Sequence, residues 1–584
     1  MQYLKEIFYL LADKRKSLPW LIALFLISSV LDLIGLGLIA PYTLLIINPE
    51  LFDNSIVNEL IKELGFSFGI SELIFVLSLI LFGVFVLKTV SIIFINKIII
   101  KFSLQLQTDL RYKLMNAYQN LNYSEYLRRN SSEYILAIQS YTGQFSNGVF
   151  QNVLRFLSEG IAVVVIVMML AFNNGPALFL LVFLLGGMGY SYDRIFRNKI
   201  KIYGKEANLY STQMVKGINE GIDGLKEIRI LGCENYFHNI VKESAEQFSD
   251  YNSKAQIIRI APRYLLELML LTFIVLLVMG TYWSGSNIEN LIPTLSLFGM
   301  AATRLVPSSN ILISGLSQIR FGRHATNQLY KDLKNFEEID FFIDDNIEME
   351  SSDKFESLIL DRVYFRYQDA KEYALNNLSI NIVKGESIGL IGPSGSGKTT
   401  LLDTMLGLLE PESGNILFNN KPLQKRFAAW RANVAYLPQQ VLLIDNSLAC
   451  NIALGVPENQ INEQNLLSAI KQARLNELVQ QLPEGVNTII GERGVRLSGG
   501  QRQRVALARA FYHGRNVLIM DEATSALDNE TEREIVEEIK RLKGLKTLIV
   551  IAHRLTTVKH CDRIYHLEKG KIINYGSYAS VINE

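Results

Sequence analysis

Hydrophobic residues are distributed very unevenly along this chain. Six apolar runs lie before about residue 325, and each approaches or exceeds the ~20 residues that a helix needs to cross a bilayer. They are Leu18–Ile47, Ser71–Ile100, Asn152–Phe172, Pro176–Tyr192, Ala261–Trp283 and Leu291–Leu316. A buried helix of a soluble protein accounts for one such run but not for six in series. The pattern therefore predicts a polytopic α-helical membrane domain with six transmembrane helices over residues 1–330.

Lysine and arginine are concentrated in alternate loops between these runs. The loop after the second run contains Arg111, Lys113, Arg128 and Arg129, and the loop after the fourth contains ten more basic residues between 194 and 254. The other loops contain only Lys62. Because basic loops remain on the cytoplasmic side, we expect a multi-pass protein of the cytoplasmic membrane with both ends of the chain in the cytoplasm. The polar helical periodicity of the inner loops predicts that the membrane helices continue into the cytosol.

Three shorter segments complete the outline. The first 20 residues resemble an amphipathic helix at the membrane surface and lack the features of a secretory signal. Residues 51–66 are predicted as a short amphipathic helix outside the membrane. Residues 331–355 are charged and acidic, which is typical of a linker. Residues 356–584 then alternate β-rich and helical runs, which predicts an α/β domain with a largely parallel sheet.

Composition excludes some classes of function. The net charge is +1, so general electrostatic attraction to nucleic acid is not expected. The three cysteines, Cys233, Cys450 and Cys561, lie far apart and predict reduced thiols rather than a disulfide framework or a zinc site.

A phosphate-binding loop is predicted at "GPSGSGKT", which fits G-x-x-x-x-G-K-[ST] between an apolar strand and a helix. Glycines let backbone N–H groups close around a phosphate, and the helix N-terminus adds its positive end. Lys398 is expected to reach the β- and γ-phosphates of ATP, and Thr399 to bind Mg²⁺. The predicted cofactor-binding residues here are Gly392, Pro393, Ser394, Gly395, Ser396, Gly397, Lys398, Thr399 and Thr400.

Two further strand ends carry candidate chemistry. In "VLIMDE", Asp521 is expected to hold Mg²⁺ and Glu522 to act as the general base that polarises water. His553 follows another apolar strand and is expected to contact the γ-phosphate. A lone acidic pair or histidine is more often structural, so these assignments depend on the whole set.

Together with "LSGGQRQR", "YLPQQ" and "SALD", these motifs resemble the ATP-binding cassette family over residues 356–584. The resemblance implies that Gln439 contacts Mg²⁺ and water, that Tyr367 stacks on adenine, and that Asp528 lies at the dimer contact. It also implies that the signature residues Ser498, Gly499, Gly500 and Gln501 meet ATP held by a second chain. One chain has one phosphate loop and one signature, so a homodimer binding two ATP molecules is expected.

The resemblance extends to communication between the two halves. The segment "GERG" (Gly491–Gly494) resembles the one by which exporters of this family sense their membrane helices. The regions 120–134 and 218–237 resemble the family's two coupling helices. Six spans followed by a cassette resemble the exporter branch rather than an importer, so the expected activity is ATP hydrolysis coupled to transmembrane translocation.

Charged residues inside the apolar runs indicate what is transported. Arg263 with Glu267, and Arg155 with Glu159, have the spacing of local helix pairs, whereas Lys88 and Arg304 have no acidic neighbour at that spacing. A buried charge is costly unless it faces a partner or a water-filled cavity. We therefore predict Lys88, Arg263 and Arg304 as substrate residues for an anionic, lipid-linked cargo.

The external helix and the wording "TRLVPSSN" resemble the bacterial flippases of lipid-linked oligosaccharides that serve protein N-glycosylation. Ile311 and Lys88 depart from that pattern, where arginines are expected. The leading hypothesis is accordingly a flippase for a pyrophosphate-linked glycolipid. A multidrug or lipid A-type exporter of the same fold is the alternative, and a membrane-anchored regulatory ATPase is a third class that six charged spans disfavour.

Overall fold

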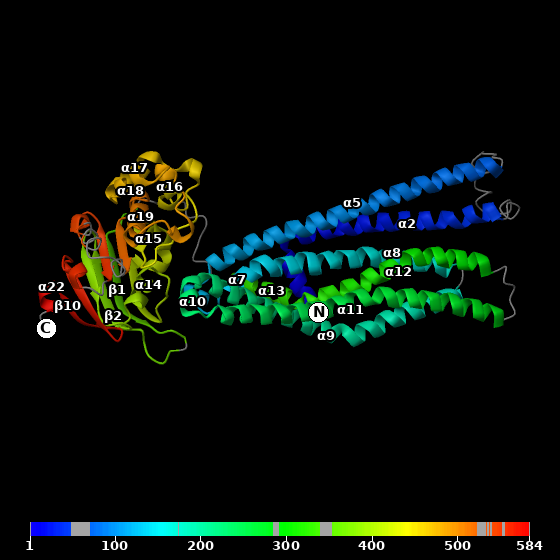
Figure 1. Cartoon of the computed structure of the whole chain (residues 1–584), viewed down its shortest axis with the longest axis horizontal. Coiled ribbons are helices and arrows are strands. Elements are labelled where there is room, and N and C mark those ends of the chain that lie inside the picture. Colours follow the sequence, from blue (N-terminus) through cyan, green and yellow to red (C-terminus); the bar gives the residue numbers. More distant parts are fainter. Residues whose placement is uncertain are drawn as a thin grey trace. The chain divides into compact units, whose positions relative to one another are not determined.

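The chain divides into two compact units in its computed structural model. The model describes residues 2–47, 70–172, 175–283, 291–338, 353–368, 370–521, 533, 537, 540–551 and 555–582. One unit consists of residues 1–121 and 128–339, and the other of residues 122–127 and 340–584. The first is helical and the second is α/β (Figure 1). The predicted external helix at 51–66 lies outside the described residues.

The first unit is built from long helices that run side by side (Figure 1). Its elements are α1 (Gln2–Leu11), η1 (Ala12–Ser17), α2 (Leu18–Ile47), α5 (Ile70–Gln119), α7 (Ser131–Leu136), η2 (Ala137–Tyr141), η3 (Gln144–Phe150), α8 (Gln151–Ala171), α9 (Gly175–Asp223), α10 (Leu225–Leu231), α11 (Glu234–Trp283), α12 (Leu291–Phe321) and α13 (Arg323–Glu338). Helices α2, α5, α8, α9, α11 and α12 contain the six predicted runs. Among the described residues, four segments are long and apolar enough to cross a membrane by length and composition: Ile74–Gln119, Ser131–Ala171, Gly175–Asp223 and Glu234–Trp283.

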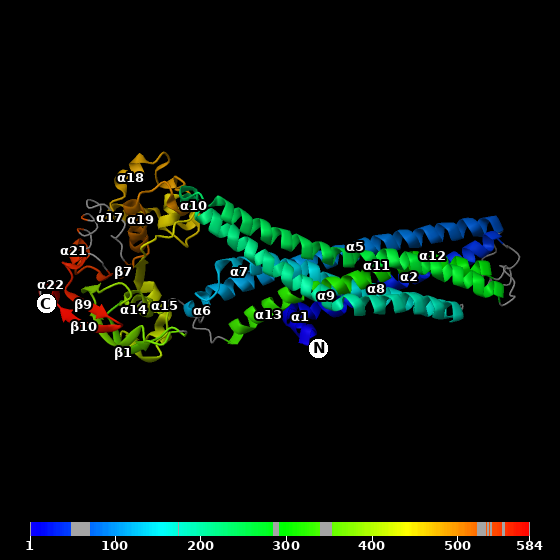
Figure 2. The ribbon, with the colours of Figure 1, turned by 60° about the horizontal axis from the view of Figure 1, so that its bottom comes forward.

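Several of these helices are much longer than a bilayer is thick. α5 and α11 have 50 residues and α9 has 49. At 1.5 Å per residue each spans about 75 Å, more than twice the ~30 Å hydrocarbon layer. α9 and α11 run side by side (Figures 1 and 2), and the hydroxyl of Tyr192 on α9 donates to the carbonyl of Ile258 on α11 at 2.7 Å. The prediction that the helices continue well past the membrane is confirmed by these lengths.

The N-terminal helix α1 packs against α13. The rings of Tyr9 and Tyr330 meet edge to face with centroids 5.0 Å apart, and the amide of Asn327 donates to the carboxylate of Glu6 at 3.2 Å. Leu4 and Phe8 are exposed on the other side of α1, so the helix has the two-faced character that its sequence predicts. The predicted linker, residues 331–355, begins as the second half of α13, and its residues 339–352 lie outside the described part of the chain.

The second unit contains two sheets. Its strands are β1 (Ser357–Phe365), β2 (Leu375–Val383), β3 (Ser387–Ile391), β4 (Ser413–Phe418), β5 (Lys421–Pro422), β6 (Val434–Leu437), β7 (Val517–Asp521), β8 (Thr547–Ile551), β9 (Arg563–Glu568) and β10 (Lys571–Gly576). The larger sheet has the order β10-β9-β3-β8-β7-β6, parallel except for β10, and the smaller has the antiparallel order β2-β1-β4-β5. The predicted α/β domain with a largely parallel sheet is therefore present.

Helices surround these sheets and include one short segment from early in the chain. They are α6 (Tyr123–Tyr126), α14 (Lys398–Met405), η5 (Leu423–Arg426), α15 (Phe427–Asn433), α16 (Leu448–Ile452), η6 (Glu458–Gln460), α17 (Glu463–Gln472), α18 (Asn476–Gln481), η7 (Gly485–Asn487), η8 (Glu492–Gly494), α19 (Gly499–Tyr512), α21 (Leu555–Val558) and α22 (Tyr578–Ile582). α14 is central: Leu401, Leu402 and Met405 are fully buried in one apolar core with residues of both sheets.

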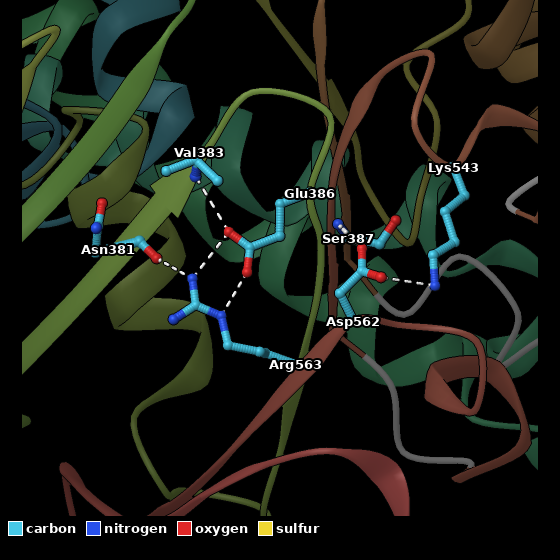
Figure 3. A network of polar contacts seen from close by, with 7 residues as sticks. All are labelled: Asn381, Val383, Glu386, Ser387, Lys543, Asp562 and Arg563. Carbon is cyan, nitrogen blue, oxygen red and sulfur yellow. Dashed lines mark hydrogen bonds and ion pairs between the residues drawn. The ribbon is translucent and has the colours of Figure 1, made fainter.

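A network of ion pairs and hydrogen bonds connects β2, β3 and β9 near the beginning of β3 (Figure 3). Arg563 donates to both carboxylate oxygens of Glu386 and, at 2.7 Å, to the carbonyl of Asn381. Asp562 accepts from the backbone of Ser387 at 2.9 Å and pairs with Lys543 at 2.7 Å. The network holds the β2–β3 turn against the start of β9. It therefore lies at the edge of the sheet opposite to the loop that follows β3.

Candidate functional site

The glycine-rich loop between β3 and α14 has a backbone that only glycine adopts easily. Gly395 has φ of +77° and Gly397 has φ of +100°. A Cβ at Gly397 would lie 2.5 Å from the carbonyl oxygen of Ala374. These glycines let the loop curl tightly at the N-terminus of α14, where backbone N–H groups remain available for an anion.

Lys398 is the first residue of α14 and its side chain folds back over the loop. Its Nζ donates to the carbonyls of Gly392 at 2.8 Å and Pro393 at 2.9 Å and lies 3.5 Å from the hydroxyl of Ser396. Only 6% of the lysine is exposed. This buried ammonium adds a positive charge to the loop, which suits the loop to a polyanion.

Next to this loop, Tyr367 contacts Thr400. The phenol oxygen lies 3.2 Å from the Thr400 hydroxyl, and the ring packs edge to face against Phe365 with centroids 5.0 Å apart. Thr399, which follows Lys398, is exposed at the start of α14. The structure thus brings the predicted adenine platform beside the phosphate loop.

The carboxyl ends of the parallel strands bring further polar groups to the same edge. Asp521 ends β7 and accepts from the phenol of Tyr436 on β6 at 3.1 Å. Gln439 is exposed just beyond the end of β6. Because parallel strands end at one edge of the sheet, this is where a ligand of such a domain is expected.

A second carboxylate, which the sequence analysis did not identify, belongs to this region. Burial, followed by the negative charge of Asp521, raises the pKa of Asp403 to about 6. Burial and Asp521 also raise the pKa of Tyr436. Asp403 lies on α14 one turn beyond Thr399, and an acidic residue in that buried turn was the signal that would have identified it.

The signature segment forms a well-capped helix start. Ser498 is the N-cap of α19, its hydroxyl accepts from the backbone of Gln501 at 3.3 Å, and the Gln501 side chain accepts from the backbone of Ser498 at 2.8 Å. Gly499 and Gly500 follow the cap. Gln501, predicted to bind nucleotide, has its side-chain oxygen engaged in this reciprocal cap.

Three other predicted residues, Glu522, Asp528 and His553, lie outside the described residues. Of the predicted segment Gly491–Gly494, residues Glu492–Gly494 form η8 shortly before the signature, and Gly491 is its N-cap.

In the membrane unit, the predicted cations have contacts that sequence spacing did not reveal. Arg304 on α12 pairs with Glu159 on α8 at 3.4 Å, and the same carboxylate oxygen accepts from Ser308 at 2.6 Å. By sequence spacing, Arg304 has no acidic neighbour and Glu159 lies one turn from Arg155. The partner of Arg304 comes instead from the packing of α8 on α12.

The other two predicted cations differ from Arg304. Arg263 pairs with Glu267 one turn along α11 at 3.2 Å, with both side chains more than half exposed, as the spacing predicts. Lys88 lies over the ring of Phe85 on α5, 5.1 Å from its centroid. Arg304 is 22% exposed and touches a second helix, whereas Arg263 is 66% exposed and pairs within its own helix.

Comparison with known proteins places this architecture. Residues 375–525 match the ABC transporter family, and residues 22–305 match the ABC transporter transmembrane region. An ATP-dependent lipid A-core flippase of Cupriavidus metallidurans is 32% identical over 448 residues, covering 76% of this chain and 73% of the relative. A protein of the same description from Alkalilimnicola ehrlichii is 30% identical over 482 residues, covering 81% and 80%.

A solved structure shares the fold. A bacterial Atm1-family ABC exporter with ATP bound superposes with a TM-score of 0.79 at 21% identity, covering 98% of this chain and 96% of that one. The membrane unit and the ATP-binding unit are thus joined in one chain in the exporter arrangement. The chain belongs to the ABC transporter family, as a half-transporter that couples ATP hydrolysis to translocation.

Proposed function

We propose that the chain forms a homodimer that flips a phosphorylated glycolipid of the lipid A-core type across the cytoplasmic membrane. The observation that carries the proposal is the match to ATP-dependent lipid A-core flippases over about three quarters of both chains. The pair of Arg304 and Glu159 supports it, because an arginine within an apolar helix is retained where it serves a function. Both termini lie in the cytoplasm in this proposal.

The nucleotide roles follow from the groups at the sheet edge. The backbone N–H groups of residues 394–400 and the Lys398 ammonium hold the phosphates of ATP, and Tyr367 stacks on the adenine ring. The hydroxyl of Thr399, the amide of Gln439 and the carboxylate of Asp521 form an oxygen donor set that suits Mg²⁺. Mg²⁺ held by these residues would neutralise part of the negative charge of the phosphates. Glu522 accepts the proton of the attacking water, and His553 contacts the γ-phosphate.

Dimerisation completes each site in this proposal. The helix start at Ser498, with Gly499 and Gly500, offers a hydroxyl and unhindered backbone amides to an anion. The side chain of Gln501 caps this helix within its own chain. Its role in this proposal is to hold the helix start in place and not to contact the nucleotide. A second copy of the chain supplies the phosphate loop that faces this helix start. One chain cannot form a complete site by itself, because it has a single phosphate loop and a single signature segment.

The cargo headgroup is recognised inside the membrane unit. A phosphate, like the carboxylate of Glu159, presents negative charge and acceptor oxygens to Arg304. We infer that the headgroup phosphate replaces Glu159 on Arg304, while Ser308 retains the released carboxylate. Lys88 and Arg263 add positive charge along the route. A lipid-linked oligosaccharide has a diphosphate with the same chemistry. It is the second candidate, which the sequence motif around Arg304 favours.

The test uses purified protein reconstituted in liposomes with ATP. Lipid A-core glycolipid, the same glycolipid without its phosphates, and a polyprenyl diphosphate oligosaccharide are compared as stimulators of ATP hydrolysis and as flipped cargo. The proposal expects stimulation and flipping of the first, weak response to the second, and loss of both activities in Glu522→Gln. Preference for the polyprenyl diphosphate would select the second candidate, and equal response to the glycolipid with and without phosphate would overturn headgroup recognition.

A further inference from the structure

A buried carboxylate joins three elements at the cytosolic end of the membrane unit. The carboxylate of Asp332 on α13 accepts from the phenol of Tyr118 on α5 at 2.6 Å and from the guanidinium of Arg129 at 2.9 Å. Its side chain is 6% exposed. Each carboxylate oxygen thus has its own donor, and one donor is a cation, so the arrangement is fully satisfied.

Aromatic packing makes this cluster rigid. The rings of Tyr118 and Tyr134 meet edge to face with centroids 4.7 Å apart, and the Arg129 guanidinium lies 5.9 Å from the Tyr134 ring. Burial, together with the charge of Asp332, raises the pKa of Tyr118, so its phenol remains a donor at physiological pH. Tyr118 and Arg129 thus hold Asp332 directly, and Tyr134 on α7 packs against both of them.

The residues of this cluster lie next to the points where the chain passes between the two units. The chain leaves the membrane unit after residue 121, contributes residues 122–127 to the ATP-binding unit, and returns at residue 128. It leaves again after residue 339, beyond the end of α13. Tyr118 precedes the first departure, Arg129 follows the return, and Asp332 precedes the second departure. All three crossings of the chain are thus tied to one carboxylate.

The inserted segment is itself anchored in the ATP-binding unit. Tyr123 on α6 packs against the apolar core that contains α14, and burial followed by the charge of Asp403 raises its pKa. Tyr123 thus connects α6 to the core around α14, and Arg129 follows only three residues after the end of α6. The contacts of Arg129 therefore decide how α6 is connected to the membrane unit.

We propose that Asp332 is a positioning residue for coupled transport, which clamps the return of α6 to α13 so that nucleotide-driven displacement of α6 moves α12 and α13 together. The alternative is a purely structural role, in which the cluster only stabilises the helix bundle. The proposal depends on ATP-driven translocation by this chain and not on the identity of the cargo. It predicts uncoupling rather than inactivation when the clamp is removed.

The experiment measures amide hydrogen exchange along residues 323–338 in the full-length protein in lipid nanodiscs, without nucleotide and trapped with ATP and vanadate. The wild type is expected to change its exchange in α13 between the two states. Asp332→Asn should reduce that change by about tenfold while basal ATP hydrolysis stays within about twofold, since coupling and chemistry are separate free energies. The charge-reversed double variant Arg129→Asp with Asp332→Arg should recover at least half of the change.

Two further variants make the test decisive. Tyr118→Phe removes one hydrogen bond and keeps the charges, so it should give an intermediate change in α13 even where Asp332→Asn folds poorly. Lys216→Gln disrupts an exposed pair with Glu220 on α9 and should behave as the wild type. A full nucleotide-dependent change in Tyr118→Phe and Asp332→Asn would overturn the proposal. So would a loss of basal hydrolysis that matches the loss of the change in α13, because that result identifies a structural role.

Discussion

The guanidinium of Arg304 lies 3.4 Å from the carboxylate of Glu159, which belongs to a different membrane helix. Ser308, fully buried one turn along α12, donates to the same carboxylate oxygen at 2.6 Å. Pro307, between them, has no backbone N–H to donate within the helix, so α12 is locally less constrained there. The pair is therefore a defined ionic contact at a point where the helix can adjust.

Glu159→Gln is expected to favour an anionic headgroup, because it removes the internal competitor for Arg304. The half-saturating concentration of phosphorylated glycolipid for stimulating ATP hydrolysis should fall by about tenfold, which corresponds to about 1.4 kcal/mol. Arg304→Ala should raise it by at least as much and spare basal hydrolysis. Glu246→Gln, the same change in the exposed pair with Lys242 on α11, is the matched control and should shift it less than twofold. Weaker stimulation in Glu159→Gln would refute the exchange.

The platform role of Tyr367 predicts different results for two substitutions. Tyr367→Phe keeps the ring and loses only the contact with Thr400, so ATP affinity should stay within about twofold. Tyr367→Ala should weaken ATP binding by about 1 kcal/mol, or about fivefold, through lost stacking. Titration with a fluorescent ATP analogue measures both. Tyr373→Ala removes a nearby exposed tyrosine and serves as the control; if it weakens binding more than Tyr367→Ala does, the platform has been assigned to the wrong ring.

Asp403 predicts a pH-dependent stability of the nucleotide-free protein. Its pKa is about 6 in the folded state against 3.8 when unperturbed, so the folded protein binds the proton more tightly. Its favourable contribution is present below about pH 4 and is lost as the pH rises through about 6. Asp403→Asn should therefore raise the free energy of unfolding by about 1–2 kcal/mol at pH 7.5, after allowance for solvent screening, and by less at pH 5.

Thermal unfolding of the full-length protein at the two pH values checks this. The exposed Asp445→Asn is the control and should show no pH-dependent difference from the wild type. A larger gain for Asp403→Asn at pH 5 than at pH 7.5 would contradict the assigned direction of the pKa.

The network in Figure 3 predicts a loss of stability without a loss of chemistry. Glu386→Gln leaves the Arg563 guanidinium without its carboxylate and should lower the free energy of unfolding by about 2 kcal/mol, less than for a fully buried pair because Arg563 is 34% exposed. ATP hydrolysis per folded molecule should be unchanged, since the network lies opposite the nucleotide edge. Glu412→Gln, in an exposed pair with Arg366, should cost less than about 0.5 kcal/mol. An equal loss in both variants would show that burial does not distinguish them.

Local sequence patterns were sufficient for most of the architecture. The first apolar run coincides with α2 at both ends. A helix that crosses a bilayer needs an unbroken run of apolar residues, and such a run is visible in the sequence. The phosphate loop was equally predictable, since its glycines and lysine act within a few residues of one another. These features depend on neighbours in the chain and need no knowledge of tertiary contacts.

Long-range pairs were not predictable in the same way. Arg304 meets Glu159, and Asp403 faces Asp521, only because particular helices and strands pack together. The use of Gln501 as a reciprocal cap was available in principle, because a serine followed three residues later by glutamine is the sequence form of a capping box. The family resemblance directed attention to nucleotide instead.

The self-contained grip of Lys398 bears on which anions can enter the site. Its ammonium already satisfies two loop carbonyls, so a newcomer must break both contacts before it gains the charge. A small ion such as free orthophosphate offers little in return, whereas a nucleotide also engages the curled amides and the neighbouring aromatic ring. The loop thus favours ligands that make several contacts at once, such as a nucleotide, over a small ion such as orthophosphate.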